Sequence, residues 1–128
     1  MSDKFTVEII SPEKTILKQE TSEVIIPSFE GQMGILRDHI PLITFLRPGL
    51  IIIKAEKENK FYVEEGTVEF SNNNLLILTS TAKELKNFDK GLINSLIEKE
   101  VSKLRDHKIS DKDRYMTSHK VETLKEIS

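Results

Sequence analysis

Cysteine and tryptophan are both absent from this 128-residue sequence, and aromatic residues make up 6% of it. Without cysteine, the chain can form neither a disulfide bond nor a thiolate metal site, which suits a reducing compartment. The low aromatic content disfavours the concave aromatic platform by which many sandwich modules bind carbohydrates or small molecules. A free-standing binding module of that kind remains the alternative interpretation of this chain.

Long apolar runs are missing as well. No run approaches the roughly 20 residues that cross a bilayer, and the segment Met1 to Lys4 does not resemble a secretory signal, so we expect a soluble protein with only indirect membrane contact. The formal net charge of −2 argues against nucleic acid as a partner. Residues 83–128 carry 11 basic and 9 acidic side chains, which alternate and therefore predict a solvated helical surface.

Residue patterns for catalysis and metal binding are also lacking. The three histidines, His39, His107 and His119, lie far apart, and none begins a metal-ligand spacing. Glu64 and Glu65 are neighbours, so on a strand they point to opposite faces and cannot act as an acid–base pair. We therefore predict no catalytic, cofactor or metal site, and a function in binding.

Short apolar segments dominate the first 82 residues, and several alternate with period two. Phe5, Val7 and Ile9, for example, alternate with polar residues. Comparable segments follow at Thr15–Leu17, Val24–Ile26, Ile35–Leu36, Leu50–Ile53, Phe61–Val63, Val68–Phe70 and Leu75–Leu78. Many short strands separated by turn-forming residues predict a sandwich or a barrel.

After Thr81 the apolar spacing becomes helical. The repeating positions are Leu92, Ile93, Leu96, Ile97, Val101 and Leu104. Asp89 is expected to cap this helix, and Ser110 with Asp113 resembles a capping box that begins a second helix. We predict a mainly β fold with an α appendage: a β-sandwich domain over residues 1–84 and an antiparallel two-helix hairpin over residues 85–128.

The segment from Ile26 to Gly49 is the most distinctive part of the sequence, because glycine and proline interrupt an apolar run. Turns or strand irregularities are expected where backbone freedom is needed, at Gly31, Gly34, Pro41, Gly49 and Gly66. On this interpretation Gly34→Val costs about 1–3 kcal/mol of stability. A phosphate loop is disfavoured because a strand, not a helix, is expected after Gly34. Phe29 and Met33 are candidate contact residues.

The same segment resembles the signature of the epsilon subunit family of F-type ATP synthases, a subunit that is called delta in mitochondria. The matching positions are Gly31, Gly34, Ile35, Leu36, His39, Pro41, Leu42, Pro48 and Gly49. The resemblance extends on both sides and covers nearly the whole chain. Two positions depart from the family pattern: Arg37 stands where proline is frequent, and Glu65 stands where a second glycine is common.

The resemblance implies a flattened ten-stranded sandwich and a non-catalytic subunit of the central stalk, which links the gamma subunit to the c-ring during rotary ATP synthesis. It implies a c-ring contact at Glu30, Gly31 and Gln32, and a gamma contact at Ser11, His39 and Thr44. It also implies a peripheral membrane protein on the cytoplasmic face of a bacterial inner membrane. A further hypothesis is that the helical hairpin contacts the alpha/beta catalytic head and restrains ATP hydrolysis.

Some members of this family bind ATP through an Asp-x-x-Arg-Ala motif at the first helix. In this chain Asp89 is present, but Leu92 replaces the arginine and Ile93 replaces the alanine. Leucine cannot pair with phosphate. Gly91 also weakens the start of the helix by about 1 kcal/mol relative to alanine. We therefore expect weak ATP binding or none.

Overall fold

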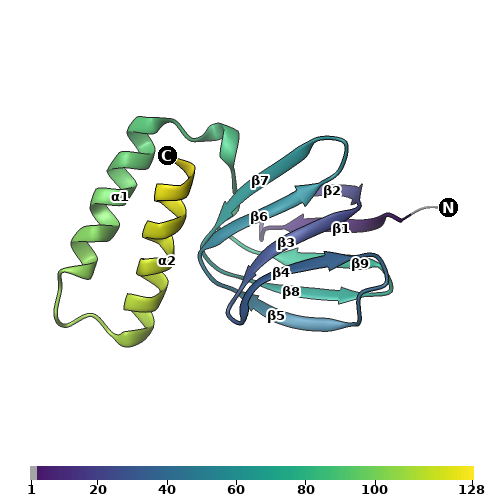
Figure 1. Cartoon of the computed structure of the whole chain (residues 1–128), viewed down its shortest axis with the longest axis horizontal. Helices are drawn as coiled ribbons and strands as arrows, with labels where there is room; N and C mark the ends of the chain where they lie inside the picture. The colour runs from purple at the N-terminus through teal and green to yellow at the C-terminus, as the bar shows by residue number, and fades with distance from the viewer. Residues whose placement is uncertain (1–2) are drawn as a thin grey trace.

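The computed structural model describes residues 3–128, so Met1 and Ser2 of the expected first domain lie outside the described residues. Within this range ten strands precede two helices (Figure 1). The strands are β1 Phe5–Ile10, β2 Thr15–Thr21, β3 Glu23–Ser28, β4 Gly31–Leu36, β5 Leu42–Leu46, β6 Gly49–Lys54, β7 Glu58–Val63, β8 Gly66–Ser71, β9 Asn74–Leu78 and β10 Lys83–Glu84. The 3-10 turn η1 Leu85–Asn87 leads into the helices α1 Lys90–Leu104 and α2 Asp111–Ile127.

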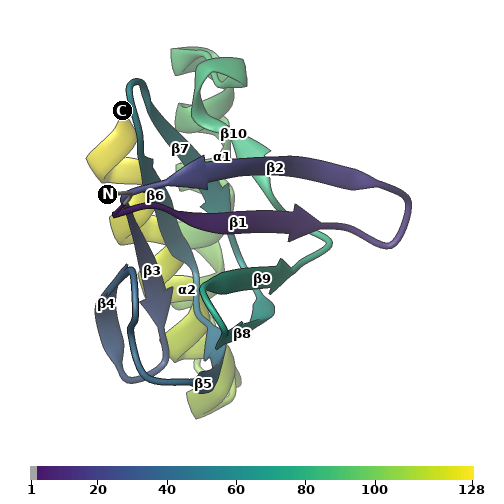
Figure 2. The same cartoon turned by 90° about the vertical axis from the view of Figure 1, so that its right-hand side faces the viewer.

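The ten strands form one hydrogen-bonded sheet that folds over itself into two layers (Figures 1 and 2). The strand order is β10-β7-β6-β3-β5-β8-β9-β1-β2, and β4 pairs with β3 outside this path. A single residue pair, Ser28 with Leu46, connects β3 to β5, so the sheet passes from one layer to the other there. β1 and β9 run parallel, whereas the other paired strands run antiparallel. The predicted ten-stranded sandwich is confirmed.

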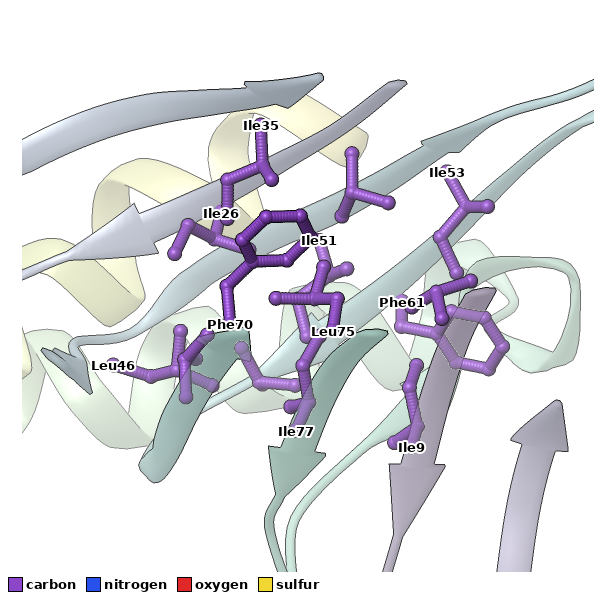
Figure 3. Packing of buried hydrophobic residues seen from close by; sticks show 14 of the residues in the cluster. Ile9, Ile26, Ile35, Leu46, Ile51, Ile53, Phe61, Phe70, Leu75 and Ile77 are labelled. Carbon is purple, nitrogen blue, oxygen red and sulfur yellow. The ribbon is translucent and has the colours of Figure 1, made fainter. Parts of the chain in front are cut away.

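The core lies between the two layers, and on strands such as β1, β6 and β8 alternate residues are buried in it. Figure 3 shows Ile26 and Ile51 from one layer meeting Phe70 and Ile77 from the other in a single cluster. The ring of Phe70 also packs edge to face against Phe5, with the centroids 5.6 Å apart. Burial of this apolar surface is the main source of stability for the sandwich.

Three of the predicted turn glycines occupy positions that favour glycine. Gly31 and Gly66 begin β4 and β8 with φ angles of +120° and +155°. At Gly49 the constraint is a close contact, because an added Cβ atom would lie 2.5 Å from the Cβ of Pro27. Pro41 immediately precedes β5. These residues therefore mark strand beginnings and strand contacts.

The interpretation of Gly34 as a turn residue is corrected. Gly34 lies inside β4, pairs with Ile25 and is exposed. An added Cβ atom would approach the Oε2 atom of Glu23 at 3.2 Å, and that oxygen is the end of a flexible side chain. The tight turn forms earlier, at Phe29 and Glu30. Gly34 therefore has neither the positive φ nor the close backbone approach that the sequence led us to expect.

Both helices begin at the predicted caps. The Oδ1 atom of Asp89 accepts a hydrogen bond from the Leu92 amide at 2.7 Å. The Oγ atom of Ser110 accepts one from the Asp113 amide at 3.0 Å. Each bond satisfies an amide that the first turn of a helix leaves without a backbone partner.

The hairpin packs against one side of the sandwich, and α2 lies between α1 and the strands (Figure 1). A small apolar cluster joins Tyr62 of β7 to Ile93 of α1 and Leu124 of α2. Strand pairing continues to Glu84, because β10 pairs with β7 just before the helical part. Independent folding of residues 1–84 and 85–128 stays a prediction.

Candidate partner interface

An exposed apolar face lies on the outside of the layer that contains β5, β8, β9 and β1. Because Thr44 and Leu46 of β5 are buried, the alternate residues Ile43 and Phe45 point outward, and they are 76% and 59% exposed. Leu78 of β9 is 45% exposed. A soluble monomer rarely leaves a contiguous apolar patch of this kind uncovered, so it indicates a contact with another protein.

Strand register aligns this face into one row. Phe45 pairs with Thr67, Thr67 pairs with Leu78, and Leu78 pairs with Ile10. Residues opposite each other on neighbouring strands have their Cβ atoms about 5 Å apart. The four side chains therefore lie next to one another across β5, β8, β9 and β1, and three of them are apolar. We call these residues, together with Ile43, the outer apolar row.

A hollow of about 940 Å³ extends the outer apolar row toward α2. Its apolar lining includes Ile10, Phe45 and Leu78 of the row, with Phe29 from the β3–β4 turn and Met116 from α2. Lys112 of α2 and Glu65 are charged residues at its wall. A partner side chain in this hollow would touch both the sandwich and the hairpin.

The three residues expected near gamma lie at different places relative to this face. Ser11 lines the hollow, and its Oγ atom accepts a hydrogen bond from the Lys14 amide at 3.2 Å. His39 is half-buried in the β4–β5 connection, where its ring lies 6.0 Å from that of Phe70. Thr44 is 6% exposed and faces the core, so the surface around it belongs to its neighbours on β5.

Of the three residues expected to contact the c-ring, Glu30 lies in the turn between β3 and β4, and Gly31 and Gln32 begin β4. Glu30 and Gln32 are exposed, and Gly31 carries the positive φ of the turn. The Oγ atom of Ser28 donates to the carbonyl of Gly31 at 2.6 Å and accepts from the Glu30 amide at 3.2 Å. The buried serine thereby fixes the backbone of an exposed turn, which is a suitable geometry for a contact loop.

Sequence reasoning missed the outward residues of β5 and β9. The segment Leu42–Leu46 is apolar at four of its five positions, so its alternation does not reveal which face is buried. The signal that could have found them is the excess of apolar residues in these strands. A strand with one solvated face normally carries polar residues on that face. Ile43, Phe45 and Leu78 could have been selected on this basis.

Glu64 and Glu65 lie in the connection between β7 and β8, not on a strand as the sequence led us to expect, and their carboxylates have different partners. Glu64 accepts a hydrogen bond from the Tyr62 hydroxyl at 3.1 Å and lies 3.6 Å from the Nζ atom of Lys120. Glu65 instead accepts from Ser80 at 2.9 Å. Burial and the nearby carboxylate of Glu64 raise the pKa of Tyr62, so its hydroxyl remains a donor. Of these contacts, the one between Glu64 and Lys120 joins the sandwich to the hairpin.

Residues 3–128 contain no group of three or more histidine, aspartate or glutamate side chains placed to hold a metal ion. In the same range, neither helix is long and apolar enough to cross a membrane.

Comparison with known proteins identifies the family. The model of the ATP synthase delta/epsilon chain β-sandwich domain matches residues 4–85. The chain is 43% identical to the ATP synthase epsilon chain of Pelagibacter ubique over the full length of both proteins. It is 32% identical to the epsilon chain of Chelativorans sp. over 88% of this chain and 87% of the relative.

A solved structure supports the same fold. A chain in the cryo-EM structure of the Euglena gracilis mitochondrial ATP synthase, which includes F1 and the c-ring, superposes with a TM-score of 0.79. The match covers 98% of this chain and 79% of that chain at 19% identity, so it bears on the fold alone. With a family model over most of the chain and a full-length relative at 43% identity, this protein belongs to the ATP synthase delta/epsilon chain family.

Proposed function

We propose that the protein is the non-catalytic epsilon subunit of a rotary ATP synthase and that its outer apolar row is the surface that binds the gamma subunit. The observation that carries the proposal is the exposure of Ile43, Phe45 and Leu78 on one face of a chain related throughout its length to epsilon chains. Interfaces commonly centre on apolar and aromatic anchors of this kind. Ser11, which follows β1 and lines the adjacent hollow, would extend this contact.

The second contact in this proposal is the β3–β4 turn, which would meet the c-ring. Glu30 of the turn and Gln32 at the start of β4 are exposed polar residues, and Ser28 fixes the backbone at Glu30 and Gly31. A short, fixed polar turn suits the polar loops of a membrane ring better than an apolar surface would. With gamma on one face and the c-ring at the turn, the sandwich would link the two parts of the rotor.

The proposed location follows from these contacts. The subunit belongs to a membrane-associated complex, and we place it on the cytoplasmic face of a bacterial inner membrane, held there through its partners. The hairpin would reach the alpha/beta catalytic head and restrain ATP hydrolysis when it leaves the sandwich. Lys120 and Glu64 would then separate, since their contact joins α2 to β7.

Binding of the purified chain to a gamma-containing F1 complex tests whether the outer apolar row binds gamma. Phe45→Asp should lower the affinity about 30-fold, which corresponds to the loss of an aromatic anchor of about 2 kcal/mol. Lys57→Asp introduces the same side chain at an exposed position of the β6–β7 turn and should leave the affinity unchanged. Equal affinities for the two variants would show that the outer apolar row does not bind gamma.

A further inference from the structure

Three rings connect α2 to the β3–β4 turn. Phe29 of the turn lies nearly parallel to Tyr115 of α2, with the centroids 5.6 Å apart and an angle of 12° between the planes. Tyr115 in turn packs edge to face against His119, one helical turn further along α2, at 4.5 Å. Both distances fall in the range in which aromatic pairs attract each other.

Phe29 contacts both the sandwich and the hairpin. Its amide donates to the carbonyl of Phe45 at 3.1 Å, which ties the turn to β5. The next residue, Glu30, donates its amide to the Oγ atom of Ser28. The backbone of the turn is thus held from the sandwich side, while the Phe29 side chain, 44% exposed, is held from the hairpin side by Tyr115.

His119, which is also on α2, lies beside the sandwich. His119 lines a small hollow together with Arg47, Gln32 and Glu122. The Arg47 amide donates to the carbonyl of Pro27 at 2.9 Å, one residue before Ser28. The Tyr115 ring therefore lies between Phe29 of the β3–β4 turn and His119 of its own helix, so its contact with Phe29 exists only while the hairpin is docked.

We propose that Tyr115 of α2 is a positioning residue for the β3–β4 turn, so that the docked hairpin adds a second restraint at Phe29, next to Glu30 and Gly31, to the hydrogen bonds that Ser28 and Phe45 already make. When α2 leaves the sandwich, Phe29 loses its stacking partner and the turn gains freedom. The position of the hairpin is thereby communicated to the surface that would meet the c-ring. Only this last consequence rests on the proposed function of the turn.

Amide hydrogen exchange of the isolated full-length chain, resolved by NMR, tests the positioning role. In Tyr115→Ala the Phe29 and Glu30 amides should exchange about two- to tenfold faster, as expected for loss of one aromatic pair. Tyr115→Phe keeps the ring and should restore the wild-type rates. Lys125→Ala, at an exposed position of the same helix, is the matched control and should leave both rates unchanged. The amides of Ile51 and Ile77 in the core report any global loss of stability.

Unchanged rates at Phe29 and Glu30 in Tyr115→Ala would overturn the proposal, as would equal acceleration at Ile51 and Ile77. A second measurement, ATP-driven proton pumping by the holoenzyme, addresses the function of the turn separately. Faster exchange with reduced pumping supports both the positioning role and the c-ring contact. Faster exchange with normal pumping keeps Tyr115 as a positioning residue and removes the c-ring contact from the turn.

Discussion

Alanine substitutions at the glycines of this sandwich distinguish two sources of destabilisation, backbone strain and overpacking. Each glycine position involves a different combination of the two. At Gly31 φ is +120° and an added Cβ atom would have open space around it, so Gly31→Ala measures backbone strain. At Gly49 an added Cβ atom would lie 2.5 Å from the Cβ of the buried Pro27, so Gly49→Ala measures overpacking. Gly66 combines both costs, and Gly34 carries neither.

The magnitude at Gly66 follows from its surroundings. Its φ is +155°, and an added Cβ atom would lie 2.6 Å from the carbonyl oxygen of Leu78. That oxygen belongs to β9, which is held between β8 and β1, so it cannot move away without disturbing two strand pairs. Strain at such a position costs about 1–3 kcal/mol, and overpacking costs about 1–3 kcal/mol. Gly66→Ala should therefore lose about 2–6 kcal/mol.

Urea unfolding of the full-length chain, followed by circular dichroism, measures these differences. Gly31→Ala and Gly49→Ala should each lose about 1–3 kcal/mol, at an m-value close to that of the wild type. Gly34→Ala is the control and should be neutral, or more stable by up to about 1 kcal/mol because alanine restricts the unfolded chain. The reasoning is refuted if Gly34→Ala is as destabilising as Gly66→Ala, or if Gly66→Ala unfolds like the wild type.

Three further predictions concern the hairpin. Burial and the charge of Arg47 lower the pKa of His119, although Glu122 acts in the opposite direction. The folded state therefore binds a proton at His119 less readily than the unfolded chain does. The stability that this site contributes is present above about pH 6.5 and is lost as the pH falls. His119→Gln should therefore flatten the dependence of the unfolding free energy on pH below that value. Glu100 is 6% exposed, and its Oε2 atom is a buried oxygen without a hydrogen-bond partner among the described residues, so Glu100→Leu should raise the midpoint of thermal unfolding. Calorimetric titration with Mg-ATP should detect no saturable binding in the micromolar range, because Leu92 stands where the family's motif has arginine.

Sequence patterns predicted the parts of this protein that depend on local chemistry. Short apolar segments located β1 to β4 and β6 to β9 but not β5 or β10. Asp89 and Ser110 predicted the helix starts because a cap acts within one turn. The glycines were harder, since the φ at Gly66 and the contact at Gly49 are set by strands that are distant in sequence. Gly34 was misinterpreted for this reason: its neighbours in sequence resemble a turn, but its partner on β3 makes it a strand residue.

Tertiary packing also determines which residues are exposed at the candidate interfaces. Apolar residues on both faces of β5 leave the choice of core face to the neighbouring strands, which bury Thr44 and expose Phe45. Tyr115 could not be selected from the sequence, because it lies on a helix with a sparse apolar stripe and its partner, Phe29, is far away along the chain. Long-range contacts of this kind have no signal in local periodicity.

The distribution of buried residues predicts that the sandwich unfolds as a unit without the hairpin. The main cluster draws all of its buried residues from β1 and β3 to β9, and its partly buried neighbours end at Ala82. The hairpin contributes to a separate and smaller cluster, which includes Tyr62, Ile93 and Leu124. A chain that ends at Asn87 should therefore keep a cooperative urea transition, with a lower midpoint because Tyr62 becomes exposed. A broad transition, or different midpoints by fluorescence and circular dichroism, would mean that the helices are part of the folding unit and that the predicted division at residue 84 is wrong.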